Sequence, residues 1–190
     1  MFQTSNSTPA GISFSGTSFD RRPQRVPLGT GVYEIVKAAC RKTPQNFDEF
    51  FAVLKCERHD DPTKVGQVFE FSRTLQGLMV QSSLREIGQL LMFSFGAAAA
   101  ALPSTEIAEV LNQALLADNW KTFNETQAIQ GKSVIGNRLG IRGYDPGWGV
   151  NKETGQPNAP RVRKTGPKAG QPYDSPLPKY VFDVAPPKAA

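Results

Sequence analysis

The sequence predicts an all-α protein with extended arms at both ends. In the central span, 61–102, apolar residues recur at steps of three and four, which is typical of a helical face. No alternating run of β-branched residues lies between turn residues, so no strand is expected. Prolines and glycines concentrate near the C-terminus. The predicted organisation is an N-terminal arm (1–28), a core of about four helices (29–137) and a basic Pro/Gly-rich tail (138–190).

The N-terminal arm lacks any hydrophobic period. Eight of its first nineteen residues are Ser or Thr, and no acidic residue precedes Asp20. This composition is typical of an organelle transit peptide. The simpler interpretation is an extended arm, and the sequence leaves both open.

Two helices are expected in the first half of the core. The first covers 30–42, and its shared apolar face comprises Val32, Ile35, Val36 and Ala39. The second covers 46–57, where Asn46 and Glu49 form a possible capping box. Its apolar residues are Phe47, Phe50, Phe51 and Leu54.

The central span is expected to form one long helix or a kinked pair. Asp61 and Pro62 suit a helix start, Ser83 and Glu86 suggest a restart, and Pro103 ends the span. A continuous helix over 63–101 would extend about 60 Å at ~1.5 Å per residue. The residues expected to be buried are Phe71, Leu75, Leu78, Leu91 and Phe95. A further helix starts near Ser104 and directs inward Ile107, Val110, Leu111, Ala114 and Leu115.

The tail carries the whole net charge of +5, because nine basic and four acidic residues follow position 137. Prolines separate these basic residues, which favours a solvated or protein-bound tail over a nucleic-acid-binding one. Aromatic side chains can fix such a tail on a partner, and we predict partner contacts by Tyr144, Trp148, Tyr173, Tyr180 and Phe182. Deletion of 143–190 is then expected to leave the stability of the core unchanged.

No catalytic, nucleotide or metal motif is evident. His59 is the single histidine, and the segment 56–61 holds too few ligands for structural zinc. Gly131-Lys132-Ser133 lacks the first glycine of a phosphate loop. Cys40 and Cys56 are interpreted as buried thiols, with a disulfide as the alternative. We therefore expect a non-enzyme without cofactor, metal or small-molecule substrate.

Two segments carry a resemblance to a known family: FSRTLQGLM (71–79) and NRLGIRGYDPGWG (137–149). With this length and layout, the chain resembles the ATP-synthase-associated subunits of chlorophycean algae. The resemblance implies a non-catalytic peripheral-stalk component of a mitochondrial ATP synthase, on the matrix side of the inner membrane. Its partners would be other protein subunits, and its membrane association would be indirect.

The alternative function is nucleic-acid packaging by a helical coat or nucleoprotein with a basic tail. Residues 29–137 contain ten Lys/Arg and twelve Asp/Glu, so the sequence predicts no basic groove in the core. On this evidence nucleic acid is the less favoured partner.

Overall fold

Strands occupy most of the segments for which helices were expected, so the all-α prediction is wrong. The computed structural model describes residues 24–76, 80–115, 120–149, 151–165, 169–172 and 178–187. Strand residues outnumber helical residues. The main sheet is antiparallel, has the order β3-β2-β1-β6-β7, and consists of β1 (Gly29–Lys42), β2 (Asp48–His59), β3 (Val68–Thr74), β6 (Arg138–Tyr144) and β7 (Lys179–Val184).

The remaining elements lie between β3 and β6 in the sequence, apart from one short 3-10 turn after β2. A small hairpin follows the helices. In chain order these elements are η1 (Pro62–Lys64), α1 (Val80–Ser94), α2 (Ala97–Ala100), α3 (Ser104–Leu115), α4 (Trp120–Thr126), β4 (Ala128–Ile129) and β5 (Lys132–Ser133).

Strand β1 replaces the first predicted helix. Its inward side chains include Tyr33, Ile35, Ala38 and Cys40, all of them buried. The spacing changes from two to three after Ile35 because the pairing with β2 shifts register there. An extra residue of this kind interrupts the alternation of a strand. Of the predicted helical face, only Ile35 belongs to this inward row, and Val36 is 38% exposed. The apolar residues therefore lie on both faces of a strand, and their helix-like spacing in the sequence was coincidental.

Strand β2 replaces the second predicted helix. Phe50, Ala52, Leu54 and Cys56 are buried at every second position, as expected for a strand with one face on the core. The predicted capping residue Asn46 lies instead in the turn between β1 and β2, with a φ of 62°. Asparagine tolerates this left-handed conformation well, so its role here is in a turn.

The central span is divided between a 3-10 turn, a strand and helices. Asp61 does cap a helix, because its side chain accepts from the Thr63 amide at 2.9 Å, but η1 has only three residues. Ser83 is buried inside α1, so the predicted restart at this residue is wrong. No described helix is long and apolar enough to cross a membrane.

Several predicted core residues are confirmed. Phe71, Leu75 and Leu91 are buried, whereas Phe95 is only partly buried and Leu78 lies outside the described residues. The predicted helix after Ser104 is also confirmed as α3, with Val110, Leu111 and Leu115 in the core and Ile107 and Ala114 at its margin.

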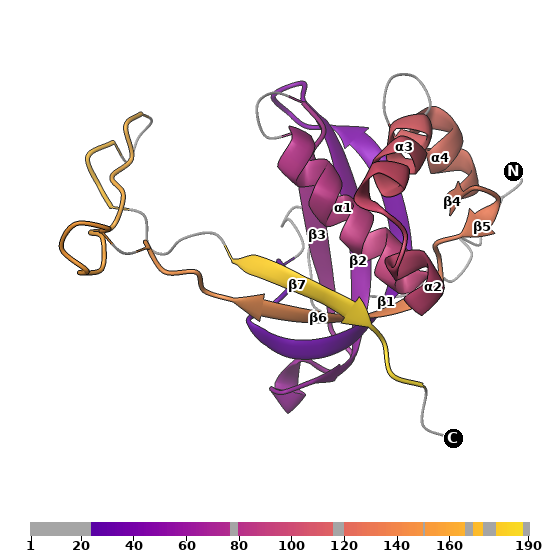
Figure 1. Cartoon of the computed structure of the whole chain (residues 1–190), viewed down its shortest axis with the longest axis horizontal. Coiled ribbons are helices and arrows are strands. Elements are labelled where there is room, and N and C mark those ends of the chain that lie inside the picture. The colour runs from indigo at the N-terminus through magenta and orange to yellow at the C-terminus, as the bar shows by residue number, and fades with distance from the viewer. Residues whose placement is uncertain are drawn as a thin grey trace, which may run out of the picture.

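The helices pack together on the core side of the sheet (Figure 1). Helices α1 and α3 meet at Gly88, where a Cβ would lie 2.8 Å from Cγ2 of Ile107. A larger residue at this position would push the two helices apart. Helix α4 is tied to β1, because the Asn124 side chain accepts from the Cys40 amide at 2.6 Å and donates to its carbonyl at 2.7 Å.

The two edge strands of the sheet face each other across the core. The Phe71 ring on β3 makes edge-to-face contacts with Tyr180 and Phe182 on β7, at centroid distances of 6.1 and 5.7 Å. The backbone at 24–26 lies between them: Glu70 donates its amide to the Gln24 carbonyl at 2.8 Å, and the Tyr180 hydroxyl donates to the Val26 carbonyl at 3.0 Å. The sheet is thus curled into a partly closed barrel.

The connectivity is that of an OB-fold. Three consecutive strands form a meander, the helices follow, and the fourth large strand pairs back onto β1 before the fifth pairs with it. This is a five-stranded, partly open Greek-key barrel. The barrel joins segments on both sides of residue 137, where the sequence placed the boundary between core and tail.

Candidate nucleic-acid interface on the outer face of the barrel

The outer face of β1–β3 presents three rows of side chains that cross the strands. The register aligns Lys37 with Val53 and Glu70, Ala39 with Phe51 and Ser72, and Arg41 with Glu49 and Thr74. The alternation of each strand turns these side chains away from the core. In OB-folds the face of the second and third strands is the usual ligand surface.

Phe51 occupies the centre of this face, and two cations cover its ring. The Arg41 guanidinium carbon lies 4.3 Å from the ring centroid, and the Lys37 ammonium lies 5.6 Å from it. Cations over an aromatic face are attracted by the ring quadrupole. The covering leaves Phe51 only 7% exposed although it points away from the core.

Arg41 is held in place by carboxylates on both neighbouring strands. It donates to Glu70 through Nη2 at 2.7 Å and Nη1 at 3.2 Å, and to Glu49 through Nε at 2.9 Å. Burial alone would lower the pKa of Arg41, but the bonds and charges of Glu70 and Glu49 outweigh it and raise that pKa. Arg41 therefore stays charged at any accessible pH.

More cations flank this face at its margins. Lys55 is exposed on β2 and lies opposite Glu34 of β1. At the end of the sheet opposite Arg41, where β6 pairs with the start of β1, the segment between β6 and β7 projects beyond the barrel (Figure 1) and exposes Lys152, Arg161 and Lys164. The loop between the fourth and fifth strands is one of the two that border the ligand surface of an OB-fold.

The aromatic residues predicted to bind partners have different environments. Tyr144 is 40% exposed at the end of β6. Trp148 is half-buried, and its carbonyl accepts from the Asn158 side chain at 3.1 Å. Tyr180 and Phe182 pack inside the barrel against Phe71, so their rings are engaged within the chain. Tyr173 lies outside the described residues.

Family models and curated proteins give no match to this sequence. The candidate interface therefore depends on the geometry and charge of this chain alone. The resemblance to ATP-synthase-associated subunits stays an untested prediction.

The other motifs noted in the sequence do not converge on a site. Lys132 belongs to the small hairpin strand β5, and the turn before it joins β4 to β5, whereas a phosphate loop joins a strand to a helix. No group of three or more His, Cys, Asp or Glu side chains with metal-binding geometry occurs within the described ranges. His59 Nδ1 accepts from the Asp61 amide at 2.9 Å, so this nitrogen helps to fix the turn that leads into η1.

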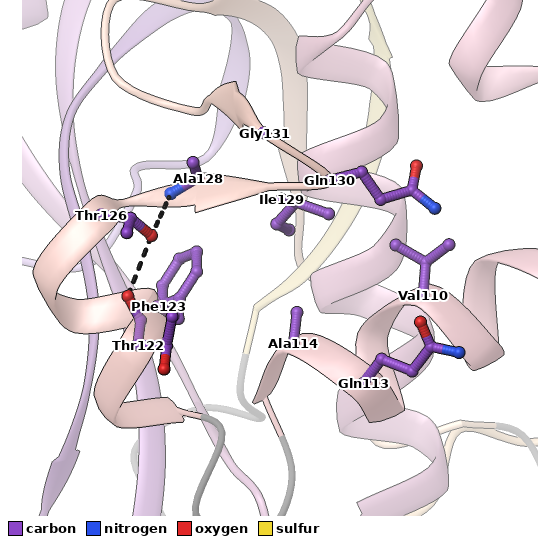
Figure 2. Close-up of a pocket in the computed structure, with 10 residues that line it drawn as sticks. All are labelled: Val110, Gln113, Ala114, Thr122, Phe123, Thr126, Ala128, Ile129, Gln130 and Gly131. Atoms are coloured by element: carbon purple, nitrogen blue, oxygen red, sulfur yellow. Dashed lines mark hydrogen bonds between the residues drawn. The ribbon is translucent and has the colours of Figure 1, made fainter.

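A second concave site lies between α3, α4 and the β4–β5 hairpin. It is a cavity of about 400 Å³ whose wall includes Phe123 and Ile129, with the side chains of Gln113 and Gln130 on the same side (Figure 2). The Thr126 hydroxyl is engaged, because it donates to the Thr122 carbonyl at 2.9 Å and accepts from the Ala128 amide at 3.3 Å. No ionisable side chain lines this cavity, so it offers apolar and amide contacts and no acid–base chemistry.

Cys40 and Cys56 are both buried and free, which confirms the thiol interpretation. Burial, with a smaller contribution from Asp48, raises the pKa of the Cys40 thiol to about 12. The folded state therefore holds this proton more tightly than the unfolded chain does. The resulting stability is fully present below the pKa of the unfolded thiol and is lost as pH rises toward 12.

We expect the unfolding free energy, measured with urea between pH 8 and 10.5, to fall with pH because of the raised pKa of the Cys40 thiol. Above roughly pH 8.5, wild type should lose stability more steeply than Cys40→Ala, by about 1.4 kcal/mol per pH unit. Only the difference in slope matters, because Cys40→Ala also changes packing. Parallel pH profiles for the two proteins would show that the Cys40 thiol titrates alike in the folded and unfolded states.

Proposed function

We propose that this protein binds single-stranded nucleic acid across the outer face of β1–β3. The observation that carries the proposal is the Phe51 ring, placed at the centre of the OB-fold ligand surface and bordered by Lys37, Arg41 and Lys55. Proteins that bind single strands combine a cationic surface for the backbone with aromatic rings on which bases stack. The basic segment between β6 and β7 would add phosphate contacts at the edge of this surface.

Positive charge reaches this surface mainly from the segment between β6 and β7. On the outer face itself, Lys37, Arg41 and Lys55 are matched by Glu34, Glu49 and Glu70, so the face is close to neutral. The sequence-based argument against nucleic acid counted charges over 29–137 and so left out the exposed Lys152, Arg161 and Lys164. A balanced charge over 29–137 is thus compatible with phosphate contacts made by this segment.

The peripheral-stalk function has lost one physical feature that suited it. A continuous helix of about 60 Å would have suited a stalk, whereas the longest helix in the described part of the chain is α1 with 15 residues. It stays a prediction from resemblance alone, and no contact in the fold favours it over nucleic-acid binding.

Fluorescence anisotropy with a labelled oligothymidylate tests the proposal. We expect saturable binding at low salt, with single strands preferred over duplex because only unpaired bases can stack on Phe51. Lys37→Glu or Lys55→Glu should weaken binding about tenfold, and affinity should fall steeply as salt rises.

Lys121→Glu is the matched control, because Lys121 is an exposed lysine on helix α4, away from this face. It makes the same charge change and should have little effect. Absence of saturable binding at low salt, or equal weakening by Lys121→Glu, would refute an interface on β1–β3.

A further inference from the structure

We propose that Glu49 and Glu70 form a carboxylate latch that holds Arg41 on Phe51 until a phosphate of the bound strand takes the guanidinium. The latch rests on the proposed function, since it regulates that same surface. In the free protein Arg41 covers the Phe51 ring, so a base cannot stack on it. In the complex Arg41 has moved to the phosphate and the ring is accessible to a base.

The geometry carries this inference. Arg41 lies on β1 and Glu70 on β3, so the guanidinium must cross the intervening strand β2 to reach its partner. Phe51 projects from β2 directly beneath that path, 4.3 Å from the guanidinium carbon. The same ion pair that satisfies Arg41 therefore covers the one aromatic ring at the centre of the face.

The two ends of the ion pair are unequal in their access to solvent. The Arg41 side chain is 37% exposed, whereas Glu70 is 8% and Glu49 is 13% exposed. An incoming anion can therefore reach the arginine from outside while the carboxylates stay in place. A phosphate accepts the same paired N–H bonds that Arg41 now gives to Glu70, so the exchange leaves the guanidinium paired.

Release of Arg41 is unfavourable because it leaves the carboxylates without their charged partner. Glu70 loses a charged partner at a mostly buried position, which is unfavourable. Lys37 lies in the same cross-strand row as Glu70, through Val53, and keeps a positive charge near it. The latch therefore weakens all binding somewhat and favours ligands that bring a phosphate and a base together.

Neutralising one carboxylate should lower this cost. We expect Glu49→Gln to tighten binding of an oligothymidylate of roughly 20 nucleotides, by about threefold to tenfold at fixed salt. Glu34→Gln is the matched control, because Glu34 lies on the outward side of the same sheet and loses the same charge, but it pairs with Lys55, whereas Arg41 bonds Glu49 and Glu70. It should change affinity less than Glu49→Gln does.

A double-mutant comparison separates the latch from simple repulsion between Glu49 and phosphate. In the background Arg41→Gln/Glu70→Gln, where two opposite charges are removed together, Glu49→Gln should no longer tighten binding. Simple repulsion would persist in that background. In wild type, the Nε–H resonance of Arg41 should shift when the oligonucleotide saturates the protein, and this readout does not depend on the folding of any variant.

The outcomes distinguish the latch from the proposed function. If wild type binds the strand but Glu49→Gln tightens binding no more than Glu34→Gln, or equally in both backgrounds, the latch is refuted and the function survives. An unchanged Arg41 Nε–H resonance at saturation refutes the latch as well. If neither wild type nor Glu49→Gln binds, both proposals are refuted together.

Discussion

Replacement of Phe71 by alanine is expected to cost about 3–5 kcal/mol of unfolding free energy, the range for a fully buried phenylalanine. Phe71 is 1% exposed and is the residue through which β3 contacts both Tyr180 and Phe182 of β7. Its loss would leave a cavity between the two edges of the barrel. Urea denaturation followed by circular dichroism measures the change.

Val181→Ala provides the comparison for Phe71→Ala. Val181 lies on β7 beside these rings in sequence but is 43% exposed, so its truncation should cost well under 1 kcal/mol. A loss for Phe71→Ala as small as that for Val181→Ala would mean that the edges of the sheet are not packed against each other.

Deletion of 143–190 is expected to prevent folding, which reverses the expectation from sequence. The deleted part includes β7, whose pairing with β6 completes the sheet and whose Phe182 is 5% exposed. Without β7, the hydrophobic edge of β6 and the Phe71 ring would both face solvent. Loss of the cooperative thermal transition, with aggregation from an exposed strand edge, is the expected observation.

Excision of 151–172 alone should behave differently. Among the described residues of this segment, most backbone hydrogen bonds join two of its own residues, as in the pairs Asn151–Gln156 and Arg163–Gln171. Its replacement by a short Gly/Ser linker should leave the melting temperature almost unchanged while weakening oligonucleotide binding, since Lys152, Arg161 and Lys164 are lost with it.

The deletion of 143–190 has its own contradicting outcome. A protein without these residues that still melts cooperatively would show that β7 is not required by the barrel.

Local helix signals were reliable where tertiary contacts agreed with them. Helix α3 follows Pro103, begins at Ser104 and has a regular apolar face, so periodicity sufficed to predict it. Strands β1 and β2 were missed for a different reason. Their partners lie far along the chain, as in the pairing of Gly29 with Gly143, and one sequence window does not contain that information.

The candidate site was not predicted because its residues lie at every second position along a strand, whereas the sequence was interpreted with a helical period. Phe50 and Phe51 are adjacent, and a helical interpretation places both in one core. In a strand they point to opposite faces, so Phe50 belongs to the core and Phe51 to the outer surface. Once the strand is recognised, the alternation through 49–55 identifies the outward residues, and Lys37 and Arg41 follow from the register of β1.

The segment 24–26, wedged between β3 and β7, has a consequence for how the protein is made. The hydrogen bond from Tyr180 to Val26 joins residues 154 positions apart. The ribosome must therefore release residues 26 to 180 before this contact can form. Until β6 and β7 emerge, the nascent meander of β1–β3 has an open edge on β1, where β6 later pairs, and contacts of such long range are slow to form. The interval between synthesis of β3 and arrival of β7 is the stage at which this open strand edge favours aggregation.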